Sequence, residues 1–233
     1  MRIYDRLYNL RRRYFGTWAV EDPRPIHREA PYTFFLPTAE EIMALRPGDL
    51  VKLTIKGSPA GLEYDAERMW VILDSLGPEE WQGRLDNAPC DMPQLQPGDR
   101  ICFQPHNIID LQYEGERDVV ETPPIRQYWE RCLVDSCVVD DGIPIYFIYR
   151  EEPELEQDGD RYADSGWRIR GDYRDISDEE LNTQKMEYIA IGKVLNADDS
   201  WLHLIDSAVG SAWLRNFQTG TYEPLDDEGN VGD

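Results

Sequence analysis

Residues 146–171 read YFIYREEPELEQDGDRYADSGWRIRG and hold an acidic loop between two ordered segments. An apolar run over residues 145–149 ends at Arg150, and a second ordered block, DSGWRI, begins at residue 164. Six carboxylates lie between them: Glu151, Glu152, Glu154, Glu156, Asp158 and Asp160. A segment with so many charges cannot bury itself, so we expect an exposed loop held by its two flanks. Loops on a rigid scaffold are where recognition usually lies.

The charge of the chain is strongly and unevenly negative, −22 over 233 residues. Residues 1–30 carry seven basic and four acidic side chains (+3), residues 31–150 carry ten and 21 (−11), and residues 151–233 carry seven and 21 (−14). Such a surface repels phosphate backbones, which disfavours nucleic-acid binding by the body of the chain. It attracts a basic protein partner, with an association that weakens as salt rises. Plain solubility is the alternative explanation.

The sequence shows no export signal or membrane segment. Residues 1–18 are too charged for a secretory signal, and no window approaches the roughly 20 apolar residues of a membrane span. We therefore expect a cytoplasmic protein. The four cysteines form no CxxC pair, and the three histidines are far apart in sequence. This pattern predicts reduced thiols, with no metal site and no other cofactor.

The N-terminal region predicts two short helices separated by a linker. Residues 3–15 place Ile3, Leu7, Leu10 and Tyr14 at helical spacing, with arginines mostly elsewhere. This basic amphipathic helix suits a membrane surface, a partner or the acidic body of the chain itself. Residues 19–31 have the proline and charge content of a linker. Thr38 and Glu41 form a capping box that opens a second helix, which ends before Pro47.

A repeated turn organises residues 45–103. LRPGDLVKL at residues 45–53 recurs as LQPGDRICF at residues 95–103, and in both the glycine supplies the positive φ that a type II turn needs. A strand follows each turn, and residues 68–74 and 81–87 predict two more strands between them. These short strands, separated by turns that contain Gly and Pro, predict a small antiparallel β-barrel-like domain with short helices.

The pattern changes at residues 121–124, where we place a domain boundary. Beyond it, apolar runs at residues 133–139 and 143–149, joined by Asp-Asp-Gly, predict a β-hairpin. Further predicted elements are a helix opening at residues 177–180, a strand at 188–194, a helix from residue 199 or 200 to Gly210, and a strand at 212–217.

These elements predict an α+β fold with an antiparallel sheet in the second domain. The expected organisation is a basic amphipathic helix and linker (1–30), a β-rich barrel-like domain (31–122), an α+β domain (123–225) and an acidic tail (226–233).

Three motifs in residues 34–111 resemble those of a bacterial domain family of unknown function. They are E-x-M-W-V at residues 67–71, G-x-L-x-N-x-P at residues 83–89, and the Gly-Asp turns that begin at Gly48 and Gly98. Residues 137–217 resemble a second family, which is grouped with the immunity proteins of bacterial polymorphic toxin systems. The matching features are Tyr-Arg-Glu at residues 149–151, DSGWRI at 164–169, and Gly-Ser before Trp-Leu-Arg at 210–215.

The second resemblance implies an immunity protein, an antitoxin that binds and blocks one secreted toxin, as in type VI systems. Neither family supplies a catalytic residue. An acidic inhibitor suits a basic toxin, and a cytoplasmic location favours a nuclease as that toxin. Two alternatives stay open at this point. One is a non-catalytic intracellular scaffold or regulatory module, and the other is a hydrolase with paired carboxylates such as Asp164 and Glu151.

The candidate toxin-binding residues are the six acids of residues 151–160 together with Asp164 and Trp167. Each has a simpler interpretation. Exposed charges are usually only solvated, and Asp164 suits a local turn in which it accepts backbone N–H groups. Trp167 alternates with Ile169, which indicates a core position, and Arg150 and Arg168 are expected to pair with neighbouring acids. The D-x-D-x-D-G spacing of a calcium loop is absent.

Overall fold

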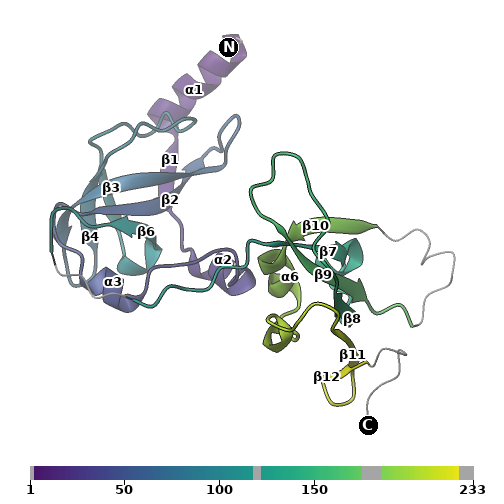
Figure 1. Ribbon diagram of the computed structural model, residues 1–233. Coiled ribbons are helices and arrows are strands. Elements are labelled where there is room, and N and C mark those ends of the chain that lie inside the picture. Colours follow the sequence, from purple (N-terminus) through teal and green to yellow (C-terminus); the bar gives the residue numbers. More distant parts are fainter. Residues whose placement is uncertain (1–2, 118–121, 175–184, 226–233) are drawn as a thin grey trace. The chain divides into compact units, whose positions relative to one another are not determined.

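The computed structural model describes residues 3–117, 122–174 and 185–225. The chain divides into two compact units (Figure 1). The N-terminal unit comprises residues 1–29 and 34–124, and the C-terminal unit comprises residues 30–33 and 125–233. The short segment 30–33 belongs to the second unit because Asn196 donates to Thr33 Oγ1 at 2.7 Å and accepts from the Tyr32 backbone N–H at 2.9 Å.

The N-terminal unit is a nearly closed antiparallel barrel, as the sequence predicted. Its strands are β1 (Thr17–Val20), β2 (Leu50–Ser58), β3 (Ala66–Leu76), β4 (Trp81–Leu85), β5 (Arg100–Phe103) and β6 (Ile108–Gln112). They pair in the order β1-β2-β3-β4-β5, and β6 pairs with β2. Its helices are α1 (Ile3–Phe15), α2 (Arg24–Glu29), α3 (Ala39–Met43) and the 3₁₀ turn η1 (Pro105–Asn107). The segment expected to be a linker, residues 19–31, thus contains the end of β1 and the whole of α2.

The two repeated turns have the same backbone conformation and the same hydrogen bond. Gly48 and Gly98 both have positive φ, at 99° and 89°, a conformation that costs glycine little. The following aspartate accepts a backbone N–H from three residues earlier in each turn: Arg46 to Asp49 at 2.7 Å, and Gln96 to Asp99 at 2.9 Å. The Thr38–Glu41 capping box is also present and opens α3.

Helix α1 forms where predicted, but it packs through its polar side. Arg12 is almost fully buried and donates to the Asp91 carboxylate at 2.9 Å. Leu7 and Leu10 are instead 62% and 54% exposed. The helix therefore lies on its own unit through an ion pair, and its apolar side faces outward.

The C-terminal unit is a six-stranded sheet with helical segments on one face. Its elements are β7 (Arg131–Asp135), α4 (Ser136–Asp140), β8 (Ile145–Arg150), β9 (Asp164–Gly171), β10 (Met186–Ala190), α6 (Ile191–Ala197), η2 (Leu202–Leu204), β11 (Ala212–Asn216) and β12 (Thr221–Pro224). The order is β10-β7-β9-β8-β11-β12. All pairs are antiparallel except β7–β9, which is parallel, so the α+β class is confirmed with one parallel pair in the expected antiparallel sheet.

The predicted hairpin over residues 133–149 is wrong. Residues 136–140 form α4, and β9 lies between β7 and β8. Cys137 and Val138 are adjacent in sequence and both buried, which a helical turn against the sheet permits and an alternating strand does not. Gly142 does form a turn, with φ 68°, but it connects α4 to β8.

Two further boundaries differ from the prediction. The strand at residues 188–194 ends at Ala190, where α6 begins, and the helix expected from residue 199 is only the turn η2. The Asp199 carboxylate accepts from Tyr32 Oη at 2.7 Å, a tertiary contact that the local pattern does not reveal. The strand at residues 212–217 is confirmed as β11, and β12 was not predicted. The helix at residues 177–180 and the tail at 226–233 lie outside the described residues.

Candidate functional site: a pinned acidic loop

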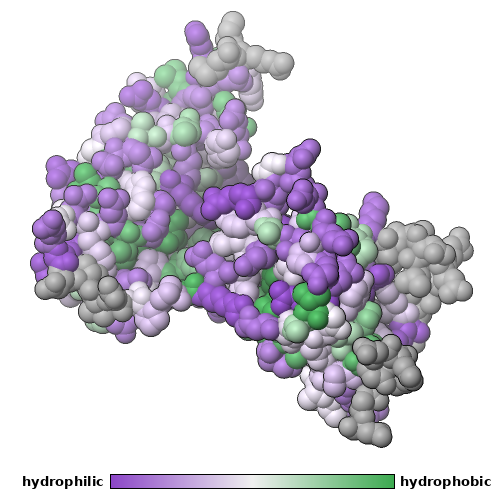
Figure 2. Space-filling model, in the orientation of Figure 1, coloured by the Kyte–Doolittle hydropathy of each residue, from purple (hydrophilic) through white to green (hydrophobic). Residues whose placement is uncertain are grey.

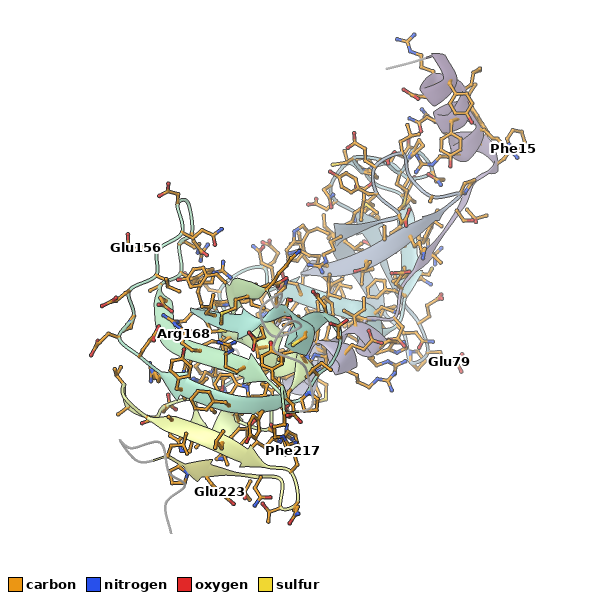
Figure 3. All side chains as sticks on the ribbon, turned by 90° about the vertical axis from the view of Figure 1, so that its right-hand side faces the viewer. Phe15, Glu79, Glu156, Arg168, Phe217 and Glu223 are labelled. Carbon is orange, nitrogen blue, oxygen red and sulfur yellow. The ribbon has the colours of Figure 1, made fainter. Side chains whose placement is uncertain are left out.

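The acidic loop, residues 151–163, joins β8 to β9 at one end of the C-terminal sheet. Its first nine residues are all exposed. Figure 3 shows Glu156 out on this loop, away from the strands. Six acidic side chains and one basic side chain, Arg161, give the loop a formal charge of −5. The structure thus presents a concentrated negative charge on a connection between two central strands.

Asp164 anchors the loop from the first position of β9. Its carboxylate accepts backbone N–H groups from Leu155 and Gly166, each at 3.1 Å. The same carboxylate receives two parallel hydrogen bonds from the Arg168 guanidinium, at 2.9 and 2.8 Å. Both side chains are buried, so this is a bidentate ion pair shielded from water. Asp164 therefore ties the middle of the loop to the strand that follows it.

Arg168 connects the start of the loop to its end. Its Nε donates to Glu151 at 2.5 Å while its terminal nitrogens hold Asp164. Figure 3 shows Arg168 against the strands of the sheet. The predicted pairing of Arg168 with neighbouring acids is confirmed. The predicted pairing of Arg150 is wrong: its guanidinium donates to the carbonyls of Ser165 and Ser207, at 3.0 and 2.7 Å.

Two more contacts hold the distal half of the loop. Arg131, on β7, forms an ion pair with Asp160 whose second hydrogen bond measures 3.0 Å. The Tyr188 hydroxyl, on β10, donates to the Leu155 carbonyl at 3.1 Å. The loop is thus fixed at residues 151, 155, 160 and 164. Four acids between these points have exposed side chains and no ion pair with a described residue: Glu152, Glu154, Glu156 and Asp158.

Two of the anchoring acids, Asp160 and Asp164, have lowered pKa values and are ionised at neutral pH. Burial of Asp164 opposes its ionisation, but hydrogen bonds from Arg168, Gly166 and Leu155 outweigh this and lower its pKa below the ordinary 3.8. The Arg131 guanidinium and the Tyr162 backbone N–H lower the pKa of Asp160. Asp160 and Asp164 therefore keep their ion pairs at neutral pH.

The paired carboxylates considered for hydrolysis are both bound to Arg168. Asp164 uses both oxygens in hydrogen bonds and is buried, so it is placed as an ion-pair partner rather than as a base or nucleophile. Within residues 3–117, 122–174 and 185–225, no group of three or more His, Cys, Asp or Glu side chains is placed to hold a metal ion. No helix in the same ranges is long and apolar enough to cross a membrane.

A comparison with known protein families matches the part of the chain that carries the acidic loop. Residues 132–225 match the model of the immunity protein Imm33 domain. The match begins within β7 and ends just after β12, so it spans all six strands of the C-terminal sheet and supports an immunity-protein family. A search of curated proteins found no match, and a search of solved structures found none.

Trp167 packs inside the core of the C-terminal unit. It is almost fully buried, and its ring lies 5.1 Å from that of Trp201 and 5.8 Å from that of Trp213. Its indole N–H donates to the Ile205 carbonyl at 3.3 Å. Trp167, like Asp164, therefore lies beneath the surface and not among the exposed acids.

Sequence reasoning missed two anchors of the acidic loop, Arg131 and Tyr188. Arg131 lies 29 positions before its partner Asp160, and Tyr188 lies 33 positions after its partner Leu155. No local spacing relates these residues to the loop. Gly166 carries a clearer signal, because its φ of 80° and the approach of the Glu151 carbonyl leave no room for a side chain at this corner of the DSGW motif.

Proposed function

We propose that this protein is an immunity protein that neutralises one cognate secreted toxin by binding it. The observation that carries the proposal is that the Imm33 match contains an anchored loop with four exposed carboxylates, none of which forms an ion pair with a described residue. An inhibitor of this kind needs a complementary surface and no catalytic group. The loop supplies such a surface, because its backbone is held in place before the partner arrives.

The charge of the loop points to a basic toxin. Exposed carboxylates accelerate encounter with a cationic surface and suppress association with acidic proteins. In the view of Figure 2, hydrophilic residues cover most of the surface, and hydrophobic residues form small separate patches. On this face, charge supplies the long-range attraction of a partner.

The class of toxin that fits best is a nuclease acting in the cytoplasm. An enzyme that cuts nucleic acid is positively charged where it meets phosphate, so an acidic loop can occupy that region in place of the substrate. In this proposal the protein acts in the cytoplasm of the cell that carries it, within a type VI or another polymorphic toxin system.

Co-expression with the effector encoded beside this gene tests the proposal. Cells that produce the effector alone should stop growing, and cells that also produce this protein should survive. Failure to rescue, or rescue without a stable complex between the two purified proteins, would contradict inhibition by binding.

A matched pair of variants tests the role of the loop. The loop variant carries Glu152→Gln, Glu154→Gln, Glu156→Gln and Asp158→Asn. The control variant changes four exposed acids of the N-terminal unit instead: Glu29→Gln, Glu40→Gln, Asp65→Asn and Glu79→Gln. Both raise the net charge from −22 to −18. The loop variant alone should lose protection, and equal protection by both would exclude the loop from the interface.

A further inference from the structure

The face of the C-terminal sheet opposite its core carries a strip of apolar and aromatic side chains. We call it the outer strip, and its members are Leu133, Phe147, Tyr149, Tyr188 and Leu214. All five are half-buried, and none belongs to the hydrophobic core of this unit. Strand alternation explains this, because Ile148 and Trp213, the neighbours of these side chains along β8 and β11, point into the core.

Strand register places the members of the outer strip side by side. Tyr188 lies opposite Leu133, Leu133 opposite Arg168, and Arg168 opposite Tyr149. Phe147 lies opposite Leu214, and its ring stacks on that of Tyr149 with centroids 5.1 Å apart. The members of the outer strip therefore lie on β10, β7, β8 and β11, with the ion-paired Arg168 of β9 between Leu133 and Tyr149.

The outer strip contains a hollow large enough for a side chain from a partner. The hollow has a volume of about 570 Å³. Phe147, Tyr149 and Leu214 line it together with Tyr146 and Tyr173. The hollow is open to solvent, and a large side chain of a partner that fills it would become desolvated there, as interface anchor residues are.

The arginines next to the hollow do not make it a cationic site. Arg168 is held by Asp164 and Glu151, and Arg170 donates to Asp135 at 2.9 Å. Arg174 is paired with Asp172 at 2.7 Å. Each of these guanidiniums is thus paired with a carboxylate of its own unit.

The acidic loop borders the outer strip directly. The Tyr188 hydroxyl holds the Leu155 carbonyl, and Glu151 bonds to Arg168 in the middle of the strip. An apolar centre beside charged side chains is the usual arrangement of a protein interface. In Figure 3, Arg168 lies against the strands and Glu156 lies on the adjoining loop.

We propose that the outer strip is the anchor site of the toxin interface, and this rests on the proposed function. The partner it fits is a protein that presents one large aliphatic or aromatic side chain flanked by Lys or Arg. The apolar side chain enters the hollow, and the flanking cations reach the four unpaired acids. A second copy of this chain fits poorly, because joining two outer strips would bring together two loops of charge −5.

Two variants of the full-length protein test the anchor. Tyr149→Ala removes the ring that stacks on Phe147, and Tyr149→Phe keeps it. Leu10→Ala, on the exposed side of α1, is the control for loss of an apolar surface residue. Against the purified effector, Tyr149→Ala should raise Kd by at least about tenfold, mainly through faster dissociation, whereas Tyr149→Phe and Leu10→Ala should bind like the parent.

A footprint of the unaltered protein keeps the test independent of folding. Chemical labelling of Tyr149 and Tyr188 should decrease in the complex, while labelling of Tyr14 on α1 should not. Parental Kd for Tyr149→Ala, or unchanged labelling of Tyr149 and Tyr188, would overturn the anchor site and leave the proposed function standing. If the unaltered protein does not bind the effector, both fail. Dimerisation in solution that Tyr149→Ala abolishes would assign the outer strip to self-association instead.

Discussion

The substitution Asp164→Asn tests how the acidic loop is held. It keeps the shape of the side chain and removes the charge that faces Arg168. The structure gives Asp164 four hydrogen bonds, two from the guanidinium and two from backbone N–H groups. An asparagine retains a single acceptor oxygen, so at least one guanidinium bond and one of the backbone bonds are lost or weakened.

The expected magnitude follows from burial. Both side chains are only 2% exposed, and removing one partner of a buried ion pair costs roughly 3–5 kcal/mol. Glu151 still faces Arg168 in the variant, so we expect the lower end, about 3 kcal/mol. With a urea m value of about 1–3 kcal/mol/M, the unfolding midpoint of the C-terminal unit should fall by roughly 1–3 M.

Urea unfolding monitored by hydrogen exchange distinguishes the stability of this unit from that of the N-terminal unit. The amides of Leu155 and Gly166, which donate to Asp164, should exchange faster in the variant. Glu152→Gln is the control, since this exposed side chain has no ion pair with a described residue, and it should change stability by no more than about 0.5 kcal/mol. Coincident midpoints for the two variants would refute the idea that Asp164 anchors the loop.

Three other predictions follow from the same contacts. In a thermal melt, Gly166→Ala should destabilise the C-terminal unit more than Gly159→Ala. Both glycines have φ near 80°, but only at position 166 would the added Cβ lie close to a backbone oxygen, at 2.1 Å. Equal losses of stability would contradict this. Arg12→Met should lower the stability of the N-terminal unit by about 3 kcal/mol, because it removes one partner of a buried ion pair. Arg13 is exposed, so Arg13→Met is the control and should leave stability unchanged. Similar thermal melts for the two variants would show that the buried ion pair contributes little. The stability that Asp164 confers is present above its unfolded pKa, ordinarily 3.8, and is lost as pH falls through its lower folded pKa. Asp164→Asn should therefore flatten the stability curve at pH values below this ordinary pKa, and parallel curves would contradict the shift.

Local chemistry explains what could be predicted from the sequence. The turns at Gly48 and Gly98 and the capping box at Thr38 each involve residues within three or four positions, so their patterns can be recognised directly. The alternation of β2 likewise predicts a strand with one buried side. The exposed acidic loop followed from composition alone.

Long-range pairing explains what could not be predicted. The placement of β9 between β7 and β8 is a tertiary choice that an Asp-Gly turn does not reveal. Arg12 is buried because Asp91, 79 positions away, receives it, although helical spacing alone suggests that the apolar side should pack. The outer strip was missed for the same reason, because strand order had to be known before its members could be placed on one face.

The association rate with the effector, measured against ionic strength, tests the central claim most directly. Between about 50 and 500 mM NaCl the rate constant of the unaltered protein should fall on the order of tenfold or more, because screening weakens attraction to the loop. The variant with four neutralised loop acids should start lower and fall less steeply. A rate constant that is the same at both salt concentrations, or an equal salt dependence for the two proteins, would contradict recognition through the acidic loop.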